Sequence, residues 1–277
     1  MTPNTANVSD YLEQLETVGY CRIPAAYSPD RMREALERVN RYYAASKDAI
    51  SDNVPFLNIG QPTLYNLQNK DSFFLELLFE PKIIEDILLH FLNDQWFKQI
   101  PEGDPNYILR SFIARSSNTK LPMHLDSFVP YLGSHVFIMQ YSIILEPQDE
   151  ENGCTVVVPG SHHAGEYTTQ DSFADAVPIE SDVGDVVMWD SRLWHGTTEN
   201  RSGSSRWAIV ATFCRWWMKQ HWQTTRSMPQ EIFDTLAPRE KAVLGFCSIP
   251  HFDESAGIDL KSGYDDLRPR VSDFDRM

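Results

Sequence analysis

Four residues of this chain have types and an order that could carry out metal chemistry. His124 and Asp126 lie in the stretch Met-His-Leu-Asp, where an extended segment would direct both side chains to the same side. His195 follows 71 residues after His124, and Arg206 follows 11 residues after His195. Two imidazoles and one carboxylate are the ligands with which proteins hold a non-haem Fe(II) that keeps open coordination positions. A guanidinium binds a carboxylate through two charge-assisted hydrogen bonds, so Arg206 could hold the far carboxylate of 2-oxoglutarate. The set predicts a reaction type but no substrate.

The order of these residues separates them from a second His-x-Asp pair, His251 and Asp253. No histidine follows His251 to complete a site, so we interpret it as a surface or packing residue. His90 ends an apolar helical pattern, while His162 and His163 follow a Pro-Gly-Ser turn. We interpret these three as structural histidines.

The surroundings of Arg206 strengthen its assignment. On an alternating strand it shares a face with Ala208, Val210, Thr212 and Cys214, which are all small and uncharged. Burying a guanidinium on such a face without an anionic partner is costly. The pattern therefore predicts that an anion binds Arg206.

The composition excludes several classes of partner. The chain of 277 residues has 39 acidic against 24 basic side chains, a formal charge of −15. Nucleic acid and anionic membranes demand basic patches, so neither is expected as a partner. The four cysteines show no Cys-x-x-Cys pairing and the N-terminus has no secretory pattern, so we expect reduced thiols in a cytoplasmic protein. Monomer and homodimer both stay open.

The first hundred residues carry mostly helical patterns. Ser9 could cap a first helix that Gly19 stops, and a short strand-like step over residues 20–24 follows. Ser28-Pro29 is a typical start for a second helix. Apolar spacing predicts two more helices over residues 71–79 and 81–92.

From about residue 107 the pattern changes to short strands separated by turns, which predicts a jelly roll. The fold class is therefore mainly β with an α cover. We expect one domain over residues 1–277, with a helical cover over 1–100, a jelly-roll core over 107–217 and a C-terminal extension over 218–277 that, with residues 46–70, could act as a lid. The expected strands cover residues 107–115, 135–145, 154–158, 185–189 and 206–217.

The same residues resemble a known family, that of the phytanoyl-CoA dioxygenases, which are Fe(II)- and 2-oxoglutarate-dependent oxygenases. The resemblance is strong over residues 107–217 and looser in the N-terminal helices. Its most distinctive piece is the Asn152-Gly153 turn before Val-Pro-Gly-Ser-His. The other matching stretches are Leu-Pro-Met-His-Leu-Asp, Gly-Asp-Val-Val and His-Gly-Thr-Thr-Glu-Asn-Arg, ending at Arg206.

The resemblance implies a double-stranded β-helix with iron at one open end. It implies His124, Asp126 and His195 as the metal ligands and Arg206 as the clamp on the C5 carboxylate of 2-oxoglutarate. Fe(II), 2-oxoglutarate and O2 would be required, and succinate and CO2 would be released. Thr197 and Thr155 are further candidates for contacts to 2-oxoglutarate.

Several rival functions fit the sequence less well. An iron halogenase of the same fold would replace Asp126 by Gly or Ala so that chloride could bind the metal. A non-catalytic metabolite-binding jelly roll would have no reason to keep the four residues in this order. A metal-dependent isomerase or hydrolase would ignore 2-oxoglutarate. Within the family, hydroxylation is expected first, while desaturation, epoxidation and ring closure stay open.

The substrate is not readable, although a few residues are candidates to contact it. We expect a small organic metabolite, a natural-product intermediate with a ring-bearing or apolar body. A coenzyme A thioester is not expected, because its phosphates need Lys/Arg clusters that this chain lacks. The candidate contacts are Phe128, Trp194, Gln140, Arg115 and Trp216.

Overall fold

The computed structural model describes residues 7–46, 61–96, 103–249 and 254–255. His251 lies outside these ranges, as do residues 47–60, 250–253 and 256–277 of the segments predicted as a lid. The chain groups into two compact units. The first comprises Met1–Tyr65, Phe112–His135 and Met139–Ala211, and the second comprises Asn66–Ser111, Val136–Ile138 and Thr212–Met277. The single domain expected from the sequence stays a prediction.

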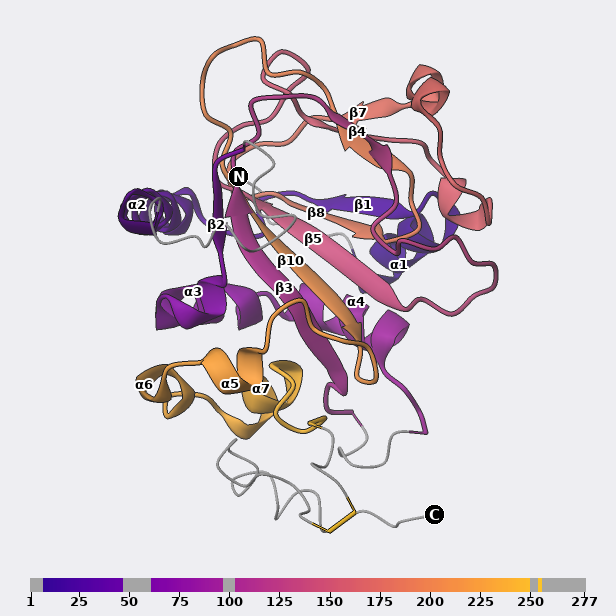
Figure 1. The fold of residues 1–277 in the computed structure, drawn as a ribbon. Helices are drawn as coiled ribbons and strands as arrows, with labels where there is room; N and C mark the ends of the chain where they lie inside the picture. The colour runs from indigo at the N-terminus through magenta and orange to yellow at the C-terminus, as the bar shows by residue number, and fades with distance from the viewer. Residues whose placement is uncertain (1–6, 47–60, 97–102, 250–253, 256–277) are drawn as a thin grey trace. The chain divides into compact units, whose positions relative to one another are not determined.

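Along the described chain, most strands lie between a group of N-terminal helices and a group of short C-terminal helices (Figure 1). The helices are α1 (Val8–Thr17), α2 (Pro29–Ser46), α3 (Ser72–Phe79), α4 (Lys82–Leu92), α5 (Thr224–Ser227), α6 (Gln230–Phe233) and α7 (Pro238–Val243). The strands are β1 (Tyr20–Ile23), β2 (Thr63–Tyr65), β3 (Tyr107–Arg115), β4 (Leu121–His124), β5 (Ile138–Ile144), β6 (Thr155–Val157), β7 (Val177–Ile179), β8 (Val186–Asp190), β9 (His195–Thr197) and β10 (Ala208–Arg215). No helix of the described residues is long and apolar enough to cross a membrane.

The strands form two sheets. The larger has the order β1-β8-β5-β10-β3-β2, and the smaller has the order β4-β9-β6-β7 (Figure 1). The paired strands run antiparallel, and neighbours in a sheet are often distant in sequence. Two antiparallel sheets connected in this way are a jelly roll, so the predicted fold class is confirmed.

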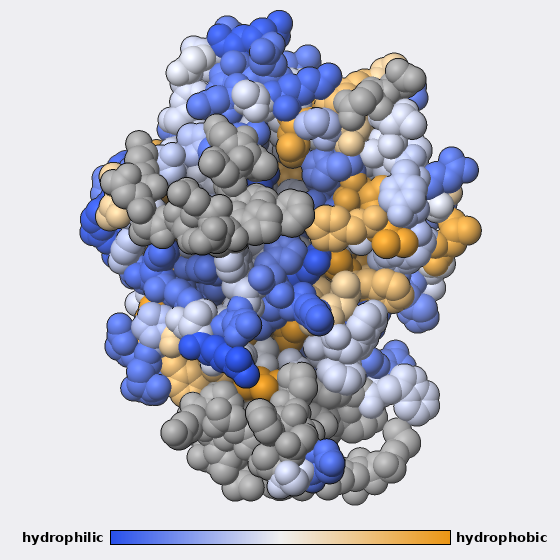
Figure 2. Space-filling model, in the orientation of Figure 1, coloured by the Kyte–Doolittle hydropathy of each residue, from blue (hydrophilic) through white to orange (hydrophobic). Residues whose placement is uncertain are grey.

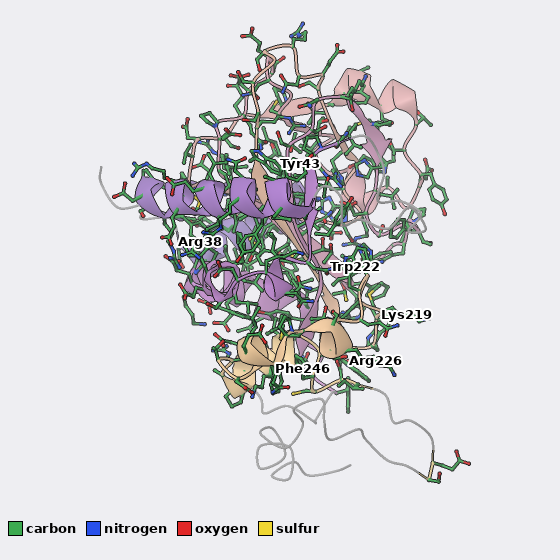
Figure 3. All side chains as sticks on the ribbon, turned by 60° about the vertical axis from the view of Figure 1, so that its left-hand side comes forward. Arg38, Tyr43, Lys219, Trp222, Arg226 and Phe246 are labelled. Atoms are coloured by element: carbon green, nitrogen blue, oxygen red, sulfur yellow. The ribbon has the colours of Figure 1, made fainter. Side chains whose placement is uncertain are left out.

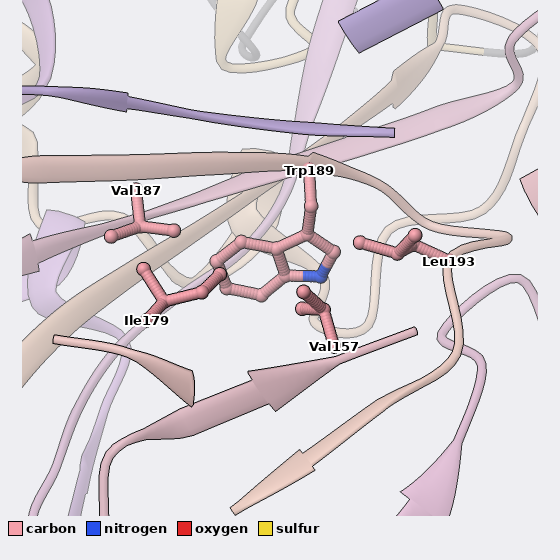
Figure 4. Close-up of a cluster of buried hydrophobic side chains, with 5 residues drawn as sticks. All are labelled: Val157, Ile179, Val187, Trp189 and Leu193. Carbon is pink, nitrogen blue, oxygen red and sulfur yellow. The ribbon is translucent and has the colours of Figure 1, made fainter. Parts of the chain in front are cut away.

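Within the first unit, a hydrophobic cluster packs residues of the larger sheet against residues of the smaller sheet. Trp189 and Val187 come from β8 of the larger sheet, and Val157 and Ile179 come from β6 and β7 of the smaller sheet. The Trp189 indole lies between these side chains and Leu193 (Figure 4). Full burial of one such side chain contributes about 1.5–3 kcal/mol. The cluster thus keeps the smaller sheet, which carries both candidate histidines, in place.

The N-terminal helices follow the predicted spacing with one correction. α1 begins at Val8, and Asn7 is its N-cap, where Ser9 was expected. The Asp10 carboxylate accepts a hydrogen bond from the Asn7 N–H at 3.1 Å, which explains the earlier start. In α2, which carries Arg38 and Tyr43 (Figure 3), the Tyr43 ring packs edge-on against Trp207 at 5.3 Å.

The second unit has its own apolar packing. Ile108, Ile138 and Cys214 form a buried cluster from β3, β5 and β10. Phe246 (Figure 3) lies 4.9 Å from the ring of Phe233 at the end of α6. All four cysteines of the chain are buried and unpaired, as expected for reduced thiols.

Candidate metal centre

Two short strands place the candidate histidines opposite each other. His124 is the last residue of β4, His195 is the first residue of β9, and the two are paired across the antiparallel ladder. Their ring centroids lie 4.1 Å apart. Asp126 was expected on an extended segment with His124, but it lies in a turn just beyond β4. There its N–H donates a hydrogen bond to the Ser191 carbonyl at 2.8 Å, which turns its carboxylate toward both rings.

The three side chains converge on one point. The distance from His195 Nε2 to Asp126 Oδ2 is 2.9 Å, and the distance from His124 Nε2 to Asp126 Oδ1 is 3.6 Å. One nitrogen or oxygen from each of the three residues lies within 4.8 Å of the others. This separation suits atoms that surround a single metal ion. The three groups could therefore hold one.

The protonation state of both imidazoles also suits a metal. His124 Nδ1 lies 2.8 Å from the Pro122 carbonyl oxygen, and His195 Nδ1 lies 2.9 Å from the Leu193 carbonyl oxygen. A carbonyl can only accept a hydrogen bond, so both Nδ1 atoms must carry the proton. Nε2, which faces Asp126, is then the atom that carries either a second proton donated to Asp126 or, in its place, a metal ion. Metal-binding histidines are commonly oriented by such a second hydrogen bond.

The carboxylate shifts the pKa values within this set. Burial lowers the pKa of His124, but the hydrogen bond and charge of Asp126 outweigh burial and raise it above its usual value. Burial likewise opposes ionisation of Asp126, yet the charge of His195 and hydrogen bonds from both histidines hold its pKa well below the usual range. Gln140, buried on β5, donates a further hydrogen bond from Nε2 to Asp126 Oδ2. The carboxylate is therefore ionised and oriented before any metal binds.

Arg206 is a buried cation whose partners are neutral. It lies two residues before β10, its Nε donates to the Ser117 carbonyl at 3.0 Å, and its N–H donates to Ser116 Oγ at 3.0 Å. Within the described residues no carboxylate forms an ion pair with it. Burial, with the nearby charge of Arg115, lowers the pKa of Arg206 to about 10. An unpaired guanidinium in this position is suited to a carboxylate ligand.

Arg115 brings a second cation to the same region. It ends β3, and its Nε is buried without a hydrogen-bond partner in the described structure. Burial lowers its pKa, while the charges of Asp126 and Tyr65 oppose the shift. Arg115 is thus within electrostatic range of both Asp126 and Arg206. The two guanidinium groups of Arg115 and Arg206 together favour the binding of an anion beside them.

The two candidate threonines are cross-strand neighbours. Thr155 of β6 pairs with Thr197 of β9. Thr197 Oγ1 accepts a hydrogen bond from the Leu121 N–H at 3.0 Å and keeps its own proton to donate. Gly153, two residues before Thr155, lies so close to Arg206 that an added Cβ would be 3.2 Å from the Arg206 Nε.

Sequence reasoning missed the contacts of Gly153, Ser116 and Ser117. For Gly153 a signal was available. The Asn-Gly pair indicates a turn with a positive φ, and φ of Gly153 is 93°. Ser116 and Ser117 have no comparable signal, because they reach Arg206 only through the fold.

Four of the five predicted substrate contacts lie in the first unit, and the fifth lies in the second. Phe128 lies two residues after Asp126 with an exposed ring, and Trp194 immediately precedes His195. Gln140 contacts Asp126, and Arg115 lies near it, as described above. Trp216 belongs to the second unit, where its Nε1 donates to the Asp94 carboxylate at 3.1 Å.

Comparison with known proteins assigns the family. A family model described as phytanoyl-CoA dioxygenase (PhyH) matches residues 15–208. The chain belongs to this family. The resemblance stated from sequence is confirmed, and the match includes all three candidate metal ligands and Arg206.

Individual relatives of this PhyH-family chain are distant. Dioxygenase af480 from Aspergillus fumigatus is 26% identical over 256 residues, which cover 88% of this chain and 79% of that protein. HygX from Streptomyces hygroscopicus, solved with nickel and 2-oxoglutarate, superposes with a TM-score of 0.58 and 16% identity, covering 78% of this chain and 90% of HygX. The epimerase SnoN, solved with Fe3+, α-ketoglutarate and nogalamycin RO, gives a TM-score of 0.57 and 16% identity over 75% of this chain and 83% of SnoN. The two structures support the fold.

Family and fold together give the class of enzyme. This PhyH-family protein is an iron- and 2-oxoglutarate-dependent dioxygenase.

Proposed function

We propose that this dioxygenase hydroxylates a small organic metabolite, an intermediate of natural-product biosynthesis, on iron held by His124, Asp126 and His195. One observation carries the proposal: both Nε2 atoms face the Asp126 carboxylate, because both Nδ1 atoms are hydrogen-bonded to backbone carbonyls. Iron and 2-oxoglutarate, when bound, supply the oxidation of a C–H bond by O2 with release of succinate and CO2.

The chain's own residues position the co-substrate. Arg206 binds the C5 carboxylate of 2-oxoglutarate, since its guanidinium is buried and no carboxylate pairs with it among the described residues. The Thr197 hydroxyl, whose proton is free to donate, and Thr155 beside it hydrogen-bond the same molecule. A dianion would also offset the charge of Arg115. As a contact to substrate, Arg115 stays a prediction.

The substrate class rests on relatives and on charge. SnoN, from nogalamycin biosynthesis, has been solved with nogalamycin RO. The acidic chain offers no basic cluster for a polyphosphate, so a compact metabolite fits better than an acyl-CoA. SnoN is an α-ketoglutarate-dependent epimerase, so enzymes of this fold reach outcomes other than hydroxylation. Product analysis is the test of hydroxylation here.

The decisive experiment uses the full chain. Anaerobic addition of Fe(II) and 2-oxoglutarate should produce the weak visible charge-transfer band of the chelate, and O2 should then yield succinate slowly even without substrate. His195→Ala should abolish both signals. His135→Ala is the matched control, because His135 is exposed in the same unit. Absence of both band and succinate in the unmodified chain would refute the proposal.

The role of Asp126 has a separate test. A carboxylate ligand occupies the position that a halide would need, so the unmodified enzyme in chloride buffer should give no chlorinated product. Asp126→Gly should lose hydroxylation. A chlorinated product from the unmodified chain would contradict the ligand assignment.

A further inference from the structure

Exposed apolar side chains gather beside the candidate metal centre. In the described part of the chain seven large hydrophobic residues are exposed, and four of them are Phe128, Val129, Leu132 and Tyr167. Large exposed apolar patches commonly mark binding sites. We call these four, together with Trp194, the apolar rim.

The rim runs from one proposed metal ligand to another. It begins two residues after Asp126 and ends at Trp194, the residue before His195. Leu132 lies on Gly165, where an added Cβ would come within 2.6 Å of Leu132 Cδ2. The Trp194 Nε1 donates to the Glu166 carbonyl at 3.2 Å. Residues 165–167 thus connect the two ends of the rim.

The loop that carries Phe128, Val129 and Leu132 of the rim is anchored at both ends. At its start, the Ser191 carbonyl accepts hydrogen bonds from Asp126 N–H and Ser127 N–H at 2.8 and 3.0 Å. At its end, Arg192 donates from Nη1 to the Gly133 carbonyl at 2.8 Å.

A buried ion pair holds Arg192 itself. Its Nη2 lies 2.6 Å from Asp190 Oδ2, and both side chains are buried. Its guanidinium also stacks over the Tyr131 ring at 4.6 Å. The exposed side chains between the anchors are therefore presented in a fixed arrangement.

The backbone of Phe128 adopts an unfavourable conformation. Its φ is 62°, in the left-handed region that bulky side chains rarely adopt, and its side chain is 64% exposed. Burial in the chain's own core does not compensate for this conformation. Strained residues of this kind cluster at functional sites.

The loop segment that carries Phe128, Val129 and Leu132 has no charged side chain. Residues 127–134 read Ser-Phe-Val-Pro-Tyr-Leu-Gly-Ser, although the whole chain has a formal charge of −15. Figure 2 shows hydrophobic residues gathered on the right-hand side of the view, where Figure 1 draws the connection between β4 and β5. A molecule covering this surface gains from apolar burial and finds no ionic partner on the loop.

We propose that the apolar rim receives the uncharged hydrocarbon or aromatic body of the substrate and directs its reacting carbon toward His124, Asp126 and His195. The inference rests on the proposed function and narrows its substrate class. The occupant is the substrate, because the rim adjoins Asp126 at one end and His195 at the other along the chain, and a reacting carbon must lie beside these ligands. Val129 and Leu132 are then specificity-determining residues.

The test uses the full chain loaded anaerobically with Fe(II) and 2-oxoglutarate. Three uncharged apolar probes, farnesol, androstenone and 2-naphthol, are titrated against tryptophan fluorescence and the visible band, with sucrose as a polar comparison. At least one apolar probe should bind and shift the band, and sucrose should not. Val129→Asn and Leu132→Asn should each weaken that binding at least fivefold.

The matched control is Val177→Asn, because Val177 is an exposed valine of the same unit outside the rim. It should leave probe binding unchanged, and all three variants should keep the thermal midpoint and the band. Equal loss in Val129→Asn and Val177→Asn, or no binding of any apolar probe, would overturn the inference. So would a dimer in sedimentation that the rim variants dissociate, since the rim would then be an interface between copies. Absence of the band in the unmodified chain would instead refute the proposed function.

Discussion

The metal centre and the apolar rim adjoin each other in the first unit, yet they are built in opposite ways. In the centre, polar side chains are held by specific hydrogen bonds: His124 and His195 to backbone carbonyls, and Asp126 to Gln140. In the rim, side chains such as Leu132, 72% exposed, lie against water. The difference teaches that the reaction needs atoms fixed to a fraction of an ångström, whereas recognition of an apolar body needs exposed area on a fixed frame.

The largest effect on this comparison is expected from Arg206→Leu. It removes the partner of the C5 carboxylate, a loss of about 2–5 kcal/mol, or roughly 30- to several-thousand-fold in the KM for 2-oxoglutarate. Iron affinity and binding of apolar probes should change little. Steady-state kinetics with varied 2-oxoglutarate measure the effect.

Arg201→Leu is the control for this variant, since Arg201 is exposed and only five residues away. An unchanged KM in Arg206→Leu would place the clamp elsewhere. Loss of iron alone would indicate a folding defect.

A smaller effect is expected from Gln140→Leu. The variant removes the hydrogen bond that orients Asp126, and loss of such an outer partner typically costs about 10–100-fold in metal affinity. The KM for 2-oxoglutarate should stay within about threefold, because Arg206 is untouched. Titration with Co(II), which does not oxidise readily, measures the affinity.

Gln148→Leu provides the comparison for Gln140→Leu, because Gln148 is an equally buried glutamine of the same unit. If both variants lost metal to the same extent, the effect would be general destabilisation and Gln140 would have no specific role.

The smallest effect is a dependence on pH. Metal needs neutral His124, whose pKa is raised, so protons compete with metal as pH falls through that pKa, beginning above about 6.5. Below it, affinity should fall by up to about tenfold per pH unit. Asp126, with its lowered pKa, stays ionised throughout and does not compete.

The raised pKa of His124 has the opposite effect on the stability of the metal-free protein, which falls as the pH rises. A raised pKa of His124 contributes stability that is present below the unfolded value of about 6.5 and is lost as pH rises through the folded value. The gain in melting temperature on adding Co(II) should therefore grow between pH 6 and pH 8. A gain that shrinks over this interval would contradict the assignment of His124.

Sequence and structure agree best where a pattern is long or chemically specific. The run over residues 107–115 coincides with β3, and the order of His124, Asp126 and His195 identified groups that the structure brings together. β4 and β9 were not predicted as strands, because they have only four and three residues and are stabilised by each other. The turn at Asp126 was missed for a similar reason, since a carbonyl 65 residues away, that of Ser191, fixes it.

Most individual hydrogen-bond partners could not be predicted. Gln140 as a substrate contact stays a prediction, whereas its hydrogen bond to Asp126 from β5 was not predicted. The left-handed backbone of Phe128 has no signal in its residue type, because phenylalanine normally avoids that conformation. Such features arise only when strands distant in sequence are assembled.

The pairing of β4 with β9 has a consequence for how the protein folds in the presence of metal. The ladder is interrupted by a shift in register between Leu121 and His124, and only beyond it do His124 and His195 stand opposite each other. A slip of one residue would turn one imidazole to the other face of the sheet. The metal ion would then bind only the chain with the correct register and not the slipped forms. Binding would therefore shift the folding equilibrium toward the correct register. Iron binding would thus stabilise the correctly folded enzyme before iron takes part in the reaction.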